Sequence, residues 1–122
     1  MQKLTKREDQ IMQVIWQSEE GMFIRDILGH LPDPKPHYNT IATIVKILVK
    51  KAFLTSEKLG NSDRYGALVS LERYRKTDIL DIKKKYFNNS LPKMMAHFAK
   101  EEQLSEAEIA ELIRIIKSKK SG

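Results

Sequence analysis

The chain has 122 residues, of which 41% are hydrophobic and 31% charged, with only 5 glycines and 4 prolines; it can form one ordinary globular domain or two small ones, and this composition excludes a low-complexity disordered protein. The chain has 22 basic and 16 acidic residues and thus a formal net charge of +6, which favours polyanionic partners. The lack of cysteine excludes disulfides and thiolate metal sites, and no apolar run approaches the roughly 18 residues of a membrane span, so we expect a cytoplasmic protein without membrane insertion.

The first predicted element is a helix that opens with a capping box. Thr5 is followed three residues later by Glu8, so each side chain can accept a hydrogen bond from the backbone N–H of the other residue. We expect Gly21 to end this helix. Its apolar stripe at helical spacing is Ile11, Met12, Ile15 and Trp16.

Two more helices are predicted on either side of a proline-rich loop. The first lies within residues 22–31 and the second covers about 38–52. The loop at 32–36 reads PDPKP, and its prolines fix φ and remove backbone donors. Neither helix is therefore expected to extend through it.

A hairpin follows the third helix. Residues 53–58 and 64–69 have strand character, and the turn LGNSD at 59–63 contains Gly and Asn, which accept positive φ.

The last third of the chain is predicted to be helical. Ser70 can cap a helix that runs toward Asn88, Pro92 lies where another helix can start, and Ser105 with Glu108 forms a second capping box.

Three helices followed by a hairpin is the element order of the winged helix-turn-helix. We therefore predict a mainly α fold with a small β-hairpin wing, divided into a DNA-binding domain at 1–70 and a helical dimerisation domain at 71–122. Helix 38–52 would enter the major groove, where Asn and Thr can contact bases and Lys can contact phosphates. The predicted DNA-binding residues are Asn39, Thr40, Ala42, Thr43, Lys46, Lys50, Lys58 and Arg64.

A simpler interpretation of that polar face stays open. Any surface helix exposes Asn, Thr and Lys, and Lys50 and Lys51 also complement the helix dipole without nucleic acid. In the hairpin turn, turn chemistry alone explains Asn61 and Ser62 without any contact to DNA.

The C-terminal part carries more apolar side chains than three short helices of about 50 residues bury alone, which predicts a homodimer. The alternative is that these side chains pack on the N-terminal domain. The predicted dimerisation residues are Ile79, Ile82, Leu91, Met94, Met95, Phe98, Ile109, Leu112, Ile113 and Ile116.

Four segments resemble the penicillinase and methicillin-resistance repressor family over nearly the whole chain. They are LTKREDQIMQVIW, NTIATIVKILVKKAFL, SLERY and FAKEEQLSEAEIAELIRIIKSK. The resemblance implies an N-terminal winged-helix domain, a C-terminal dimerisation domain and a homodimeric repressor of a palindromic double-stranded DNA operator. It also implies an upstream input, which in this family is a membrane sensor that triggers proteolysis, or a metal.

Two departures from the family pattern concern operator and input. Ala42 stands where family members commonly have Arg, so a contact to DNA is missing and the operator sequence is expected to differ. The stretch 76–87 lacks the Asn-Phe pair at which the penicillinase branch is cleaved, and the cysteine motif of the copper branch is absent. The sensor or protease upstream of this chain is therefore unknown.

The sequence predicts no enzyme, cofactor or metal site. His30, His37 and His97 lack metal-ligand spacing, and no nucleophile elbow or phosphate loop occurs. A different class of function stays open beside the repressor, namely a winged-helix protein-interaction module that does not read bases.

Overall fold

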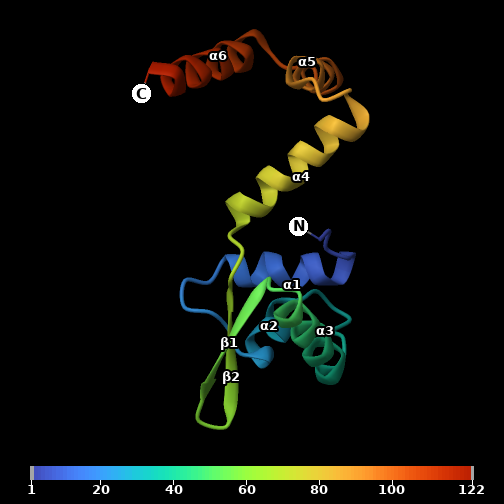
Figure 1. Cartoon of the computed structure of the whole chain (residues 1–122), viewed down its shortest axis with the longest axis vertical. Coiled ribbons are helices and arrows are strands. Elements are labelled where there is room, and N and C mark those ends of the chain that lie inside the picture. Colours follow the sequence, from blue (N-terminus) through green and yellow to red (C-terminus); the bar gives the residue numbers. More distant parts are fainter. Residues whose placement is uncertain (1, 122) are drawn as a thin grey trace. The chain divides into compact units, whose positions relative to one another are not determined.

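The computed structural model describes residues 2–121. Within that range no helix is both long and apolar enough to cross a membrane. The chain forms two compact units, residues 1–78 and 79–122. The elements in chain order (Figure 1) are α1 (Lys6–Trp16), α2 (Ile24–His30), α3 (Tyr38–Lys50), β1 (Leu54–Leu59), β2 (Ser62–Ala67), α4 (Leu71–Tyr86), α5 (Leu91–Glu101) and α6 (Glu106–Ser121).

The capping box predicted at the start of α1 is confirmed. The backbone N–H of Glu8 donates to the Thr5 hydroxyl at 3.2 Å, and the N–H of Thr5 donates to the Glu8 carboxylate at 2.8 Å. Two N–H groups that the first helical turn leaves without intrahelical partners are thereby satisfied.

Helices α1, α2 and α3 lie together beside the hairpin (Figure 1). They bury their apolar faces in one core, together with residues of the hairpin. Each buried Ile, Leu or Phe side chain contributes about 1.5–3 kcal/mol through loss of apolar surface from water. The core consists of Leu4, Ile11, Met12, Ile15, Ile24, Ile27, Leu31, Ile41, Val45, Leu48, Phe53, Leu54, Tyr65 and Val69.

Helix α3 ends two residues earlier than the pattern 38–52 suggests. The N–H of Ala52 donates to the carbonyl of Val49 at 3.0 Å, and the N–H of Phe53 donates to that of Leu48 at 2.9 Å. These two bonds form a Schellman motif, with Ala52 in the left-handed region at φ 67°. The reversal turns the chain from α3 into β1 and buries Phe53.

The predicted hairpin is present, with a tighter turn than expected. Strands β1 and β2 pair antiparallel with Leu59 opposite Ser62, so Gly60 and Asn61 alone form the turn. Gly60 has φ 65°, and a glycine with positive φ at the first turn position is typical of a type II′ hairpin.

Gly21 has a role other than ending α1, which already ends at Trp16. Met22 exchanges two backbone hydrogen bonds with Tyr65 of β2, at 2.8 and 2.7 Å, and so forms an isolated β-bridge beside the two-stranded sheet. Gly21 precedes this bridge with φ 92°, and a Cβ there would lie 2.7 Å from the Tyr65 carbonyl oxygen. Only glycine fits so close to β2.

The first unit extends beyond residue 70 because Tyr74 of α4 packs on it. Its ring centroid lies 5.7 Å from that of Trp16 and 5.8 Å from that of Phe53, and its hydroxyl accepts from the N–H of Leu4 at 3.2 Å. The start of α4 therefore belongs to the first unit by contact.

The second unit contains the end of α4 with α5 and α6. Ser90 caps α5 by accepting from the N–H of Lys93 at 3.2 Å, and Pro92 lies in its first turn. The predicted second capping box is confirmed, since Ser105 and Glu108 exchange bonds of 3.0 and 3.1 Å before α6. The predicted fold class, mainly helical with a two-stranded wing, is confirmed by these elements.

Candidate nucleic-acid interface

Helix α3 has a buried side and an exposed side. Ile41, Val45 and Leu48 have no exposed surface, because their spacing of three and four residues places them on one face. The predicted DNA-binding residues of α3 other than the half-buried Ala42 are exposed; they are Asn39, Thr40, Thr43, Lys46 and Lys50. The core thus fixes α3 in a position that leaves its polar side open.

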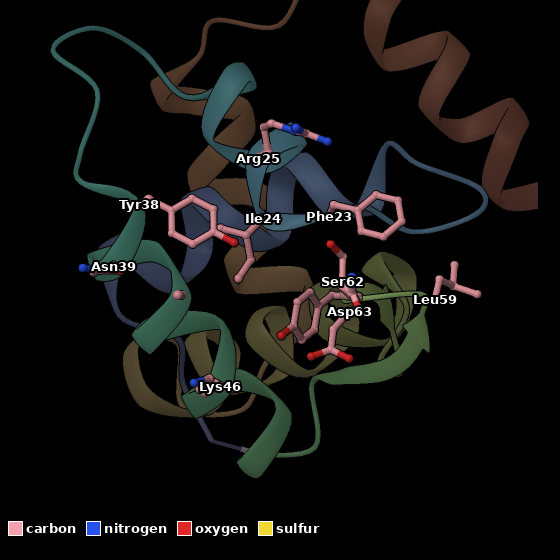
Figure 2. A pocket seen from close by; sticks show the side chains of 12 residues that line it. Phe23, Ile24, Arg25, Tyr38, Asn39, Lys46, Leu59, Ser62 and Asp63 are labelled. Atoms are coloured by element: carbon pink, nitrogen blue, oxygen red, sulfur yellow. The ribbon is translucent and has the colours of Figure 1, made fainter.

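A hollow of about 580 Å³ separates α3 from the hairpin and the start of α2. Of the residues that the sequence predicts to bind DNA, the hollow brings together Asn39, Ala42 and Lys46, which are three and four residues apart on α3. Figure 2 shows Asn39 and Lys46 on one side of it and Ser62 and Asp63 on the other. We call this space the α3–wing hollow.

Thr40, Thr43 and Lys50 do not line the hollow; they follow a neighbouring stripe of α3. The Thr43 hydroxyl donates to the backbone carbonyl of Asn39 at 2.9 Å. Its hydrogen is engaged within the helix, so the methyl group and the oxygen lone pairs remain for a ligand.

The hairpin places its charged residues on two opposite faces. Side chains alternate along a strand, and residues directly opposite in an antiparallel pair share a face. Glu57 pairs with Arg64, and Lys58 pairs with Asp63. Asp63 shares its face with Tyr65, which lines the α3–wing hollow; Arg64 lies on the other face.

Arg64 is less available than the sequence suggests, since its guanidinium forms an ion pair with Glu57 at 3.1 Å. Its Cγ would also lie 3.3 Å from a Cβ at Gly21, so the stem of Arg64 runs along the α1–α2 loop. Lys58, by contrast, is exposed and projects on the face that carries Asp63.

Sequence reasoning missed three residues of this surface. Arg25 in the first turn of α2 lines the hollow and is exposed, and Tyr38, the first residue of α3, lines it with 52% of its surface exposed. Ile47 is 41% exposed, one turn beyond Thr43. The signal for Arg25 was its place between the core positions Ile24 and Ile27, which directs it outward.

The floor of the hollow includes the Tyr65 side chain, which is 4% exposed. Burial raises the pKa of Tyr65, and the Asp63 carboxylate raises it further, against a lowering hydrogen bond with Ser56. The phenol therefore stays neutral and presents a hydroxyl, while Asp63 supplies negative charge next to it.

A second surface lies on the C-terminal unit. Ten large apolar side chains from residue 79 onward are between 37% and 67% exposed, far more than a compact unit of this size leaves uncovered. Two of the predicted dimerisation residues, Ile82 and Leu112, are half-buried, and Met94 is only 3% exposed. The ten exposed residues are Ile79, Leu80, Tyr86, Leu91, Met95, Phe98, Ile109, Ile113, Ile115 and Ile116.

Comparison with known proteins gives one family and several distant structures. A family model described as penicillinase repressor matches residues 4–118. AF1382 from Archaeoglobus fulgidus is 16% identical with a TM-score of 0.47, covering 67% of this chain and 93% of its own. A MarR-family transcriptional regulator from Rhodococcus sp. RHA1 is 16% identical with a TM-score of 0.47, covering 94% and 73%. The transcriptional regulator SlyA is 15% identical with a TM-score of 0.43, covering 95% and 72%. No curated protein matches the chain.

Proposed function

The chain belongs to the penicillinase repressor family, a family of DNA-binding transcriptional regulators, and on that premise we propose that it is a homodimeric repressor of a palindromic operator. Helix α3 enters the major groove of each half-site, and the hairpin lies along the sugar-phosphate backbone. The protein acts in the cytoplasm and represses by occupying the promoter.

The single observation that carries this proposal is the two-sided burial of α3. Three side chains, Ile41, Val45 and Leu48, are fully buried, while Asn39, Thr43 and the other polar residues face solvent. A helix held in this way presents a rigid polar ridge, which is what reading of base edges requires. Phosphate contacts from Lys46 and Lys50 supply affinity, and Asn39, Thr40 and Thr43 supply sequence discrimination.

The exposed apolar residues of the second unit support a dimer. Soluble monomers rarely leave so many large apolar side chains open, and a second copy of the same unit would cover them. Two-fold symmetry then places the two α3 helices one DNA turn, roughly 34 Å, or a multiple of it apart. This spacing is why the operator is proposed to be an inverted repeat.

Ala42 gives the interface a feature of its own. Its methyl group lines the α3–wing hollow beside Asn39 and Lys46, at the position where the resemblance to the family leads one to expect arginine. A methyl group can contact thymine but cannot hydrogen-bond guanine. We therefore propose an operator that differs from those of relatives with arginine at this position.

Selection of bound duplexes from a random pool tests the proposal. The full-length protein should enrich an inverted repeat, and its affinity for that duplex should fall steeply with added salt because phosphate contacts release counterions. A protein-interaction module would enrich no sequence and would bind duplex weakly at every salt concentration. That result would exclude the repressor.

A further inference from the structure

The α3–wing hollow contains a carboxylate that the proposed contacts do not use. Asp63, the second residue of β2, lines the hollow together with Tyr65, two residues further along the same face of the strand. Besides burial, the Asp63 carboxylate raises the pKa of the Tyr65 phenol, which lines the same hollow. Among the described residues Asp63 has no cationic partner within 4.0 Å.

Asp63 opposes the charge on the other walls of the hollow. The helical walls carry two cations, Arg25 and Lys46 (Figure 2), and both suit the phosphates of a nucleic acid. A carboxylate facing the same space repels a phosphate that approaches the wing. The helical side of the hollow therefore attracts a phosphate more strongly than the part of the wing at Asp63 does, while the exposed Lys58 remains the candidate of the hairpin for a phosphate contact.

We propose that Asp63 is a specificity-determining residue of the interface. Its carboxylate disfavours non-specific docking, in which a phosphate enters the wing side of the hollow, and it accepts a hydrogen bond from the exocyclic amino group of one operator base. Carboxylates accept such bonds well, and only some bases present an amino group at a given edge. This inference rests on the proposed function.

The size of the repulsive effect follows from electrostatics. A carboxylate and a phosphate about 7 Å apart, at an effective dielectric constant of about 40 to 80, repel each other enough to weaken binding about three- to sevenfold. The repulsion acts on every sequence whose docking brings a phosphate to Asp63. It acts least on the operator, where an amino group takes that place.

Two substitutions separate repulsion from hydrogen bonding. Asp63→Asn removes the charge and keeps a carbonyl acceptor, whereas Asp63→Ala removes both. Glu19→Gln is the matched control, because it neutralises an exposed carboxylate that does not line the hollow. Since Asp63 is itself exposed, thermal unfolding should show all three variants folded.

The measurement is fluorescence anisotropy of each full-length variant with the selected operator and with an unrelated duplex of equal length. Asp63→Asn should tighten binding to the unrelated duplex about three- to sevenfold and change operator affinity less than about twofold. Asp63→Ala should show the same gain on the unrelated duplex and a loss on the operator. Replacing operator guanines one at a time by inosine, which lacks the minor-groove amino group, should reproduce that loss if the group belongs to guanine in the minor groove.

Each contrary result has one meaning. A wild-type protein that selects no sequence overturns the proposed function itself. If the wild type reads an operator but Asp63→Asn changes both affinities by the same factor, as Glu19→Gln does, only the inference about Asp63 fails. The inference also fails if neither affinity changes.

Discussion

The Glu8 carboxylate and the Lys51 ammonium group lie 2.8 Å apart, and this ion pair ties the first turn of α1 to the C-terminal end of α3. Glu8 is 4% exposed, so its charge must be satisfied inside the protein. Lys51 therefore has a structural role as the partner of Glu8, in addition to its favourable interaction with the dipole of α3. Its neighbour Lys50 is exposed and free to meet a phosphate.

Replacing Lys51 with Met should destabilise the protein by about 1–3 kcal/mol, because Glu8 would be left buried without its cation. Burial raises the pKa of Glu8, but hydrogen bonds from Lys51 and Thr5 outweigh it and bring the pKa below the ordinary value. The stabilisation is thus present above the unfolded-state pKa of about 4.3 and is lost as pH falls through the lower folded-state pKa.

Urea unfolding of wild type and Lys51→Met between about pH 3 and pH 7 measures this effect. The stability difference should be largest near pH 7 and should shrink as the pH falls below the unfolded-state pKa of about 4.3 and through the lower folded-state pKa of Glu8. Lys50→Met is the control, and its effect on stability should stay below about 0.5 kcal/mol. A difference that did not depend on pH would show that lost packing, and not the ion pair, is responsible.

Lys46→Met should weaken binding to every duplex and reduce the slope of log affinity against log salt concentration by about one per protomer. Lys46 is exposed on α3 and lines the hollow, whereas Arg64 is paired with Glu57 on the opposite face of the hairpin. Arg64→Met should therefore change the slope much less. The slopes are measured by fluorescence anisotropy over a series of salt concentrations. Equal changes in slope for the two variants would refute the prediction that Lys46 contacts phosphate and Arg64 does not.

The sequence was sufficient to predict the elements that local chemistry determines. The Thr5–Glu8 capping box and the hairpin are both encoded by neighbours a few residues apart. The end of α3 was misplaced because Ala52 adopts positive φ, a conformation for which sequence patterns favour Gly or Asn.

Features that depend on residues far apart in the chain were not predictable. The bridge from Met22 to Tyr65 and the pair of Glu8 with Lys51 join residues about 43 positions apart, as the sequence numbering shows. The α3–wing hollow combines α2, α3 and β2, so Arg25 and Asp63 gain meaning only once the fold is known.

Ala52→Gly should stabilise the protein by about 1 kcal/mol. Ala52 is held at φ 67° by the Schellman motif that ends α3. A residue with a Cβ is strained by about 1–2 kcal/mol in this conformation, and glycine would relieve that strain. The greater backbone entropy of glycine in the unfolded chain offsets part of the gain. Thermal or urea unfolding measures the change. Ala67→Gly, at the end of β2, serves as the control and should not stabilise; equal stabilisation by both would argue against relief of strain.

Thr43 is predicted to read a base through its methyl group. Its hydroxyl hydrogen is already donated to the Asn39 carbonyl at 2.9 Å, so Thr43→Val should keep operator specificity while Thr43→Ser should lose about 1 kcal/mol of it. Competition between the operator and single-base variants measures the change. The opposite order, with serine tolerated and valine not, would assign the contact to the hydroxyl oxygen.

Ile113→Glu should convert the proposed dimer into a folded monomer. Ile113 is 47% exposed and Ile116 on the same face of α6 is 49% exposed, so a charge at 113 costs little within one chain but would be buried without a partner between two. Ser118→Glu is the control, because at 100° per residue it lies nearly opposite that face.

Sedimentation velocity of the two variants tests whether the apolar face of α6 forms the dimer contact. Ile113→Glu should sediment as a monomer with unchanged helical circular dichroism. It should lose most of its operator affinity, because a monomer has a single α3 helix and binds only one of the two half-sites. Ser118→Glu should remain dimeric and bind as the wild type does. A dimeric Ile113→Glu protein would place the contact between copies elsewhere, and the exposed side chains of α6 would then need a different explanation.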